Sequence, residues 1–565
     1  MAGGLLNIAA IGHANLFLTG NPSKTFFKVT YCKYSNFGLQ KFRIDYDGLR
    51  ELRLTEPSTF KFKVPRHADL LMDTYVAVTL PDIWSPIHHP LPTPEIKENG
   101  PNVIPDIQSG FDTGCRWAPY EFRWIENIGT AMIQEIEITC GSFTLQKYTG
   151  EYIGMMMERD FNAEKKELFH KMSGHIPELY DPANSNGRTN AYPSAVHTEN
   201  TVGAEPSIRG RNIYIPINAW FTLNSACAFP LVALQYNELH ITVTLRPIQE
   251  LFQVRDVFDS QYNFPHIQPN FNESRFQMYR FLQTPPSLEI SADKYENKLS
   301  TWDADVHLIS TYCFLSKEEA EVFARKDHIY LVKDVFKHSF ENITGSKRIK
   351  VQSQTGMISS WMWKMQRNDV NMRNEWTNYT NWPYRTVPSD SYPYFNTKTQ
   401  GQFPNVDPFD LNVTGLLTTG DFSVENRKEI METMGIVFDG DYRENVLTRG
   451  VYDYIEKYTR TKGFAKEGIY CYNFCLDTNP FEYQPSGAIN LGKFKNIDLE
   501  ISTYVPPVDQ INSSFDVLCD ENGNAIGFRK ENWRLYDYNY NLTLYEERYN
   551  ILSFIGGSCG MLHAR

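Results

Sequence analysis

The residues from Asp520 to Glu531 come closer than any other segment of this sequence to a metal-binding loop. Asp520, Asn522, Asn524 and Glu531 place oxygen side chains at positions one, three, five and twelve, as in the calcium loop of an EF-hand. Position six is Ala525, where the sharp turn of such a loop requires glycine. The flanking residues alternate like strands, and the Asn-Gly pair favours a two-residue hairpin turn. The pattern therefore predicts a β-hairpin, with calcium binding as the alternative.

Two other polar groups have the residue types of a reactive centre without its spacing. His170 and His175 lie near Glu167, but a five-residue spacing does not put both imidazoles on one helical face, as a zinc protease requires, so we expect surface histidines. Asp303 and Asp305 could hold a metal in a sugar transferase, but no glycine-rich nucleotide loop accompanies them, which favours a polar strand edge. The sequence also lacks a nucleophile elbow, a phosphate loop and a dinucleotide fingerprint. It predicts no catalytic residue, metal site or cofactor.

Nine cysteines, an odd number, are scattered through the chain. The closest pair, Cys471 and Cys475, lacks the two-residue spacing of a zinc knuckle or redox loop, so the pattern predicts reduced thiols in a cytosolic setting. Residues 1–18 are mildly apolar but have no basic region before them and are interrupted by polar residues. We therefore expect neither a signal peptide nor a membrane span there.

Aromatic residues are concentrated in and before a segment at 367–420 that is rich in Asn, Tyr, Pro and Thr. Such a segment is typical of a long surface loop, which in a compact domain is usually functional. Trp361 and Trp363 share one face of a strand and are expected in the core. The other aromatic side chains could stack on sugars, stack on bases or anchor a protein interface, and we expect a protein contact first, because an acidic chain disfavours nucleic acid. These are Trp376, Tyr379, Trp382, Tyr384, Tyr392, Tyr394 and Phe395.

The size and charge of the chain narrow the class of protein. With 565 residues the chain exceeds the size of one hydrophobic core, so two or more units are expected. Its 55 basic and 67 acidic residues give a net charge of −12, whereas a protein that condenses DNA should be strongly basic. Residues 1–66 nevertheless hold ten Lys and Arg against four Asp and Glu, so this end could face an anionic partner.

Most of the chain has the pattern of short strands that end at Gly or Pro. Clear examples in the first half are residues 61–64, 75–80, 136–139 and 239–245. Helices are expected at 163–172, after the capping box that starts at Ser316, and at 423–434. These patterns predict a mainly β protein of sandwiches or barrels, with short helical and long loop insertions.

The strand pattern repeats loosely in the second half of the chain. Strands at 61–64, 75–80 and 239–245 have counterparts in the same order at 348–351, 358–363 and 497–501. Two similar β units with different insertions would give this order. Residues 256–300, rich in Pro, Asn, Gln and Ser, would then connect the two units.

Five motifs follow one another from one end of the chain to the other. They are NLFLTGNPSKTFFK at 15–28, FRWIENIG at 122–129, AFPLVALQYNE at 228–238, YQPSG at 483–487 and NILSFIGGSCGM at 550–561. Together they closely resemble the major capsid proteins of nucleocytoplasmic large DNA viruses, of the mimivirus and algal-virus type. The signature residues, for which we expect structural roles, are Leu18, Thr19, Gly20, Asn21, Pro22, Phe26, Phe27, Lys28, Trp124, Ile125, Glu126, Asn127, Gln235, Tyr236, Gln484, Pro485, Ser486 and Gly487.

The resemblance implies a double jelly roll, that is, two consecutive eight-stranded antiparallel jelly rolls in one chain. It implies a structural protein without enzymatic activity, whose homotrimers form pseudo-hexagonal capsomers that tile the icosahedral capsid of a virion. Neighbouring capsomers and minor capsid proteins would be its partners, with an internal viral membrane beneath the shell and assembly in the host cytoplasm. Direct genome binding is not expected.

We therefore divide the chain into an N-terminal arm at 1–26, a first jelly roll at 27–255, a connector at 256–300 and a second jelly roll at 301–565. The second roll would carry a long surface insertion at about 367–470. The arm is apolar and irregular and runs into a basic stretch, so we expect it on the inner face of a shell. Two alternatives stay open: a scaffold relative that shapes membrane and is later shed, and an all-β carbohydrate-binding or glycan-active protein.

Overall fold

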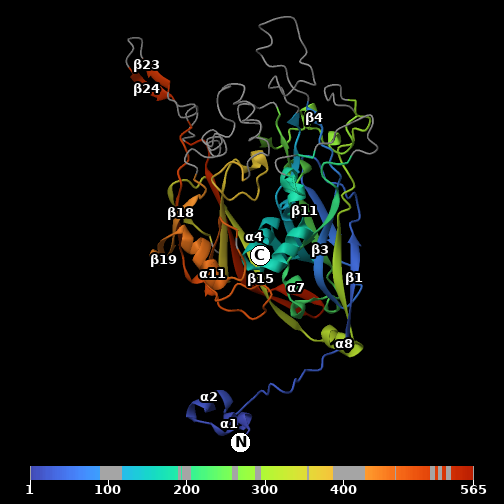
Figure 1. Cartoon of the computed structure of the whole chain (residues 1–565), viewed down its shortest axis with the longest axis vertical. Coiled ribbons are helices and arrows are strands. Elements are labelled where there is room, and N and C mark those ends of the chain that lie inside the picture. The colour runs from blue at the N-terminus through green and yellow to red at the C-terminus, as the bar shows by residue number, and fades with distance from the viewer. Residues whose placement is uncertain are drawn as a thin grey trace.

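The computed structural model describes residues 2–88, 118–188, 192–193, 205–257, 265–286, 294–352, 356–385, 427–464, 466–509, 516–519, 525–529 and 536–563. Figure 1 shows two strand-rich units side by side. The early strands β1, β3 and β11 lie in one unit, and the late strands β18 and β19 lie in the other.

The first unit is a sandwich of two antiparallel sheets. One sheet has the strand order β1-β14-β3-β9, and the short β10 (Phe229–Pro230) also pairs with β3. The other sheet has the order β2-β11-β7-β8. The eight strands are β1 (Phe37–Asp45), β2 (Ser58–Lys63), β3 (Leu70–Leu80), β7 (Ile133–Cys140), β8 (Phe143–Tyr148), β9 (Arg211–Pro216), β11 (Leu239–Leu245) and β14 (His307–Leu315).

The second unit repeats this arrangement. Its sheets have the orders β15-β25-β17-β20 and β16-β22-β18-β19. The strands are β15 (His328–Phe340), β16 (Ser346–Lys350), β17 (Met357–Arg367), β18 (Met431–Phe438), β19 (Asp441–Thr448), β20 (Ile469–Asn473), β22 (Ile497–Thr503) and β25 (Tyr540–Ile555). The short β21 (Ile489–Asn490) pairs with β17, and β26 (Ser558–Met561) pairs with β25.

Both units are eight-stranded jelly rolls with one topology. Numbered from one to eight within each unit, the strands form sheets of order 1-8-3-6 and 2-7-4-5 in both cases. The three pairs of strands matched in the sequence are the second, third and seventh strands of the two rolls. The predicted double jelly roll and its internal repeat are therefore confirmed.

The predicted boundary between the rolls is wrong. β14, which was assigned to the second roll, pairs with β1 and β3 and is the eighth strand of the first roll. Residues 256–300 therefore lie within the first roll, between its seventh and eighth strands, and the helix α8 (Lys317–Arg325) follows β14. The error has a physical cause: the closing strand of a jelly roll is far in sequence from its two partners, so no local pattern reveals the pairing.

Two of the three predicted helices are confirmed, and one is wrong in its described part. α5 (Ala163–Ser173) and α8 occur as expected, although the Ser316 side chain makes no capping hydrogen bond. Residues 423–426 lie outside the described part, but Met431 to Met434 belong to β18. Both methionines are buried and β18 pairs with β22, so tertiary packing overrides the helix propensity of this segment.

Alternation of apolar residues builds the cores. In β2 the side chains of Phe60 and Phe62 point inward, and β11 buries every second residue from Leu239 to Leu245. The buried cluster of the first roll continues into the second roll through residues such as Val332, Met362 and Tyr545, and the second roll has a further core cluster of its own around Trp361 and Trp363. Small elements that complete the first roll are β6 (Phe122–Trp124), α3 (Ile128–Met132), α6 (Pro177–Tyr180), α7 (Trp220–Leu223), β12 (Phe252–Arg255) and β13 (His266–Ile267).

The N-terminal segment stands apart from the rolls. It holds the short helices α1 (Gly3–Ala9) and α2 (Leu16–Thr19), and every residue from 2 to 36 is exposed. In Figure 1 these helices lie below the body and an extended chain connects them to it. The first strand of the first roll thus begins at Phe37 and not at residue 27.

None of the helices in the described residues has the length and apolar character of a membrane-spanning segment.

Candidate functional site

The candidate site is the junction at which the two rolls are locked together. Its central element is α4 (Gly150–Asp160), which follows β8 and is buried along most of its length. The helix begins where the Thr149 hydroxyl accepts a hydrogen bond from the Tyr152 N–H at 3.3 Å. Gly150 allows a close approach to α3, because a Cβ there would lie 2.1 Å from the Thr130 carbonyl oxygen.

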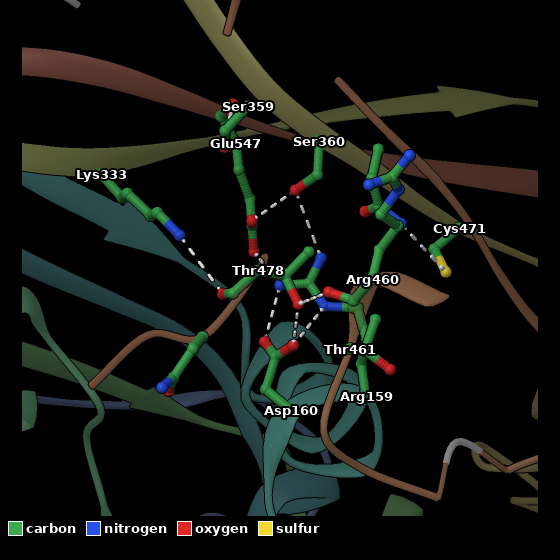
Figure 2. Close-up of polar contacts among 12 residues, drawn as sticks. Arg159, Asp160, Lys333, Ser359, Ser360, Arg460, Thr461, Cys471, Thr478 and Glu547 are labelled. Atoms are coloured by element: carbon green, nitrogen blue, oxygen red, sulfur yellow. Dashed lines mark hydrogen bonds and ion pairs between the residues drawn. The ribbon is translucent and has the colours of Figure 1, made fainter. Parts of the chain in front are cut away.

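Arg159, near the end of α4, links both rolls (Figure 2). Its guanidinium binds Asp160 through two hydrogen bonds, of 3.0 and 2.7 Å, and reaches Oε1 of Glu547 on β25 at 2.8 Å. The Arg159 side chain is 1% exposed, and neither carboxylate is more than 2% exposed. A buried cation therefore stands between one carboxylate of each roll, and such a group needs this many partners to remain charged.

The remaining oxygens of the two carboxylates are also satisfied. Glu547 accepts hydrogen bonds from Tyr152 of the first roll at 2.7 Å and from Ser360 of β17 at 2.6 Å. Although burial opposes ionisation, the charge of Arg159 and these hydroxyl groups lower the pKa of Glu547 to about 2. Asp160 accepts a hydrogen bond from the Thr478 hydroxyl at 2.5 Å.

A second polar group ties the other end of α4 to the second roll. Glu151, in the first turn of α4, forms an ion pair with Lys364 of β17 and accepts a hydrogen bond from Tyr545 at 2.7 Å. The Tyr545 hydroxyl also lies 2.8 Å from that of Thr149. Burial works against the charge on Glu151, but Lys364 lowers the pKa of this carboxyl group. Both ends of one helix are thus fixed to the neighbouring roll.

His170 and His175 line a cavity of about 420 Å³ beside this junction. The prediction of surface histidines is wrong, because their side chains are only 21% and 19% exposed. Gly174, at φ +80°, ends α5 as expected, but the turn folds back and places the two rings 4.4 Å apart. Burial lowers the pKa of His175 to about 3.

The other candidate chemistry is not assembled. Within the described ranges, no group of three or more His, Cys, Asp and Glu side chains could hold a metal ion. Asp305, which precedes β14, instead pairs with Arg43 of β1 and with Arg50. β23 (Asp516–Cys519) and β24 (Ala525–Arg529) pair as the predicted hairpin, while Asp520, Asn522, Asn524 and Glu531 lie outside the described residues.

The start of the predicted surface loop is part of the junction. Trp361 and Trp363 are in the core, as predicted. Trp376, however, donates a hydrogen bond to the Glu250 carbonyl at 3.0 Å, and Tyr379 is buried. For these two residues the prediction of an external contact is wrong, because they fill space between the rolls. Trp382 and Tyr384 are partly buried, and residues 386–426, with Tyr392, Tyr394 and Phe395, lie outside the described part.

The signature residues fall into two groups. The N-terminal set is exposed on the arm, away from both rolls: Leu18, Thr19, Gly20, Asn21, Pro22, Phe26, Phe27 and Lys28. The others lie in the body. Trp124 and Ile125 are buried in the core, Glu126 lines the histidine cavity, and Asn127 takes the left-handed conformation, at φ +55°, that starts α3.

The remaining signature residues occupy turns and contacts. Gln235 and Tyr236 donate their backbone N–H groups to the Gly557 carbonyl at 2.9 and 3.3 Å. Ser486 exchanges hydrogen bonds with Asp477, and Gly487 has φ +139°, beside Gln484 and Pro485. These contacts involve backbone atoms, the Ser486 hydroxyl and turn geometry.

Sequence reasoning missed Arg159 and Glu547, the centre of the junction. A signal was present: the run Glu546-Glu547-Arg548 interrupts a long strand with three charged residues, and all three are buried. Arg159, Tyr152 and Glu547 line a small cavity of about 70 Å³. The chemistry of the junction is that of a structural ionic lock.

The fold and this lock define a double jelly-roll protein. A family model described as the N-terminus of major capsid proteins matches residues 25–282. The structure resembles PBCV-1 VP54, with a TM-score of 0.58 at 16% identity over 96% of this chain and all of that one. The Faustovirus major capsid protein gives a TM-score of 0.59 at 12% identity, over 97% and 96% of the two chains.

Curated relatives extend the resemblance to sequence. The major capsid protein of Chrysochromulina ericina virus is 26% identical over 358 residues, which cover 62% of this chain and 55% of that protein. The chain thus spans about half the length of this relative. The major capsid protein of Phaeocystis pouchetii virus is 22% identical over 99% of both chains. The resemblance to major capsid proteins of large DNA viruses is confirmed.

Proposed function

We propose that this chain is a major capsid protein, a structural subunit of an icosahedral virion. The observation that carries the proposal is the pair of rolls with one strand order, held in a fixed relation by a buried apolar cluster that spans both rolls and by a buried ionic lock. Three such chains in a ring present six similar rolls, which can occupy a lattice site with six neighbours. The relatives carry capsid names, and the junction contains no reactive constellation, so we assign no catalytic activity.

The oligomeric state tests this proposal. Light scattering of the purified chain should give three times its mass of 65.4 kDa, and electron micrographs should show particles with a pseudo-hexagonal outline. A stable monomer, or a dimer with a twofold axis, would contradict the capsomer. Abundance distinguishes a capsid subunit from a transient scaffold, because only the former should be the main protein of purified virions.

We further propose that the N-terminal arm lies on the inner face of the shell. Its exposed apolar residues, among them Leu5, Leu6, Ile8, Phe17 and Phe27, have no contact within the described chain body that would cover them. They could dock on minor capsid proteins, while nearby Lys and Arg meet anionic lipid headgroups, each worth about 1 kcal/mol at such a surface. Virion assembly in the host cytoplasm is part of this proposal.

Limited proteolysis of intact particles tests the orientation. The first 26 residues should stay protected, while cleavage should begin in the part of 367–420 that follows the junction residues Trp376 and Tyr379, for which we propose an outer position. Early loss of the N-terminus from intact shells would reverse the assignment.

We also propose a division of the chain into domains: an arm up to residue 36, a first roll from Phe37 to Leu315 and a second roll from His328, joined by α8.

A further inference from the structure

The histidine cavity, which His170 and His175 line, is enclosed by residues of both rolls. Its volume of about 420 Å³ lies in the range of pockets that bind small molecules. The lining residues come from α4 and α5 of the first roll and from β15 and β20 of the second roll, among other segments. A molecule bound in this cavity would therefore contact both rolls.

Cationic side chains outnumber carboxylates around the cavity. The cationic side chains that line it are Lys166, Arg246, Lys337, Arg385 and Lys466. The carboxylates that line it are Glu126, Glu151 and Glu158. The cavity thus has an excess of two positive charges, although the whole chain has a net charge of −12. Positive charge gathered in a concave site attracts anions.

Two of the carboxylates serve three of the cations. Glu158 pairs with Lys166. Glu126 pairs with Arg385, and its Oε2 lies 3.7 Å from Nζ of Lys466, a side chain that is only 19% exposed. Burial and the charge of Arg385 lower the pKa of Lys466 well below its ordinary value. An anion beside Lys466 would offset both effects.

The other lining charges do not remove the excess. Glu151 pairs with Lys364, and Arg246 pairs with Glu250, and neither of these partners lines the cavity. Lys337 is exposed on β15 and forms no hydrogen bond or ion pair with any residue that the structure describes. Its ammonium group is therefore available to an anion that enters the cavity.

The two histidines add unsatisfied polar atoms. Nε2 of His170 and Nδ1 of His175 are buried, and neither forms a hydrogen bond in the described part of the chain. Burial lowers the pKa of His175 to about 3, and the charges of His170 and Lys466 act in the same direction. An anion in the cavity could accept hydrogen bonds from these imidazoles and would offset the repulsion between the cations.

We propose that the histidine cavity binds a compact anion with several phosphate groups, which contacts both rolls. Lys166 belongs to the first roll, whereas Lys337 and Lys466 belong to the second, so a ligand with several anionic groups can pair with more of these cations than a single phosphate can. The inference rests on the cavity and not on the capsid role.

The aromatic residues of the cavity favour phosphate groups over a stacked base. The Arg246 guanidinium lies 3.9 Å from the centre of the Trp376 ring. Tyr379 is 8% exposed, and the ammonium groups of Lys364 and Lys466 lie 5.2 and 5.3 Å from its ring centre. These rings already contact cations of the protein.

Calorimetric titration of the full chain with sodium tripolyphosphate tests the proposal. The titration is done at about 0.15 M salt, which screens attraction to exposed charges. We expect saturable binding of one molecule per chain, and about tenfold weaker binding of inorganic phosphate, which makes fewer charged contacts. No saturable binding of tripolyphosphate, or an equal affinity for inorganic phosphate, would overturn the proposal.

ATP distinguishes two sources of the phosphate groups. An affinity for ATP no higher than that for tripolyphosphate would support a free oligophosphate as the ligand. A higher affinity for ATP would support the same phosphate site in a nucleotide-binding role, with the base in contact with further residues.

Variants from each roll locate the bound anion. Lys166→Gln and Lys466→Gln should each weaken tripolyphosphate binding about tenfold, and the exposed Lys337→Gln, which should not disturb folding, about threefold. Lys350→Gln is the matched control, because Lys350 is exposed on β16 and does not line the cavity, so the affinity should not change. A loss confined to variants of one roll would refute contact with both rolls, and an equal loss in Lys350→Gln would refute binding in the cavity.

Discussion

Replacing Arg159 by methionine tests whether the buried ionic lock holds the rolls together. The variant keeps the aliphatic volume but leaves Asp160 and Glu547 without their cation in a site of no more than 2% exposure. Removal of one partner from a buried ion pair costs about 3–5 kcal/mol. The pKa of Glu547 agrees in direction, because burial opposes its ionisation and the charge of Arg159 is the largest of the influences that lower this pKa.

The sign of the pH effect follows from the same shift. The folded state lowers the pKa of Glu547, so its contribution is present above about pH 4.5 and is lost as the pH falls towards 2. The deficit of Arg159→Met should therefore be largest near neutral pH and shrink in acid, where the carboxylates take up protons.

Urea unfolding followed by tryptophan fluorescence measures this deficit. Arg348→Met is the matched control, because Arg348 also pairs with two carboxylates but is 52% exposed, so its loss should cost less than about 1 kcal/mol. Equal stability of the two variants at pH 7, or a deficit for Arg159→Met that does not change with pH, would refute the assignment of a charged lock.

Three further measurements probe the packing around the junction. Gly150→Ala should destabilise the fold by about 1–3 kcal/mol because its Cβ would meet the Thr130 carbonyl, whereas Gly38→Ala, with open space around it, should be nearly neutral in the same urea titration. Ile241→Ala, at a fully buried position of β11, should cost about 2–5 kcal/mol, and a smaller loss would show that the first core collapses around the gap. The folded state lowers the pKa of His175 from 6.5 to about 3, so the unfolded chain binds the proton first and the free energy of unfolding should fall as the pH drops below 6.5. His175→Gln should flatten this pH profile. A profile that the substitution leaves unchanged would show that other groups cause the pH dependence.

Local sequence patterns predicted more of the fold than of the polar junction between the two rolls. Alternation in β2 and β11 identified strands and their inward faces, and the repeated strand order showed two related units. The eighth strand of the first roll was misassigned, because only its pairing with β1 and β3, far away in sequence, determines where it belongs. The helix predicted up to Met434 failed for the same reason, since burial against β22 decides its conformation.

Such patterns could not predict the polar junction, because its residues come from separate segments of the chain. Arg159 ends a helix, Glu547 lies in the last long strand and Thr478 follows β20, and none of them has partners at a fixed sequence spacing. Trp376 and Tyr379 were placed on the surface because their neighbours are polar. These polar neighbours form hydrogen bonds inside the protein. Asn374, for example, donates hydrogen bonds to two backbone carbonyls of the first roll, at 2.8 Å each.

The position of the lock explains how two similar rolls adopt one relative orientation. In both rolls the connection between the fifth and sixth strands carries helices, α4 and α5 in the first and α11 (Glu456–Arg460) in the second. These equivalent connections meet, because Gly463 donates its N–H to the Arg159 carbonyl at 2.9 Å and Lys166 reaches the Phe464 carbonyl at 2.8 Å. Two related surfaces could pack in more than one way if they were purely apolar. A single buried arginine that requires carboxylates from both rolls destabilises every alternative packing of the two rolls, because any other arrangement leaves a buried charge unpaired. The groups that form this junction are buried within one chain, so contacts between chains must use other surfaces of the rolls.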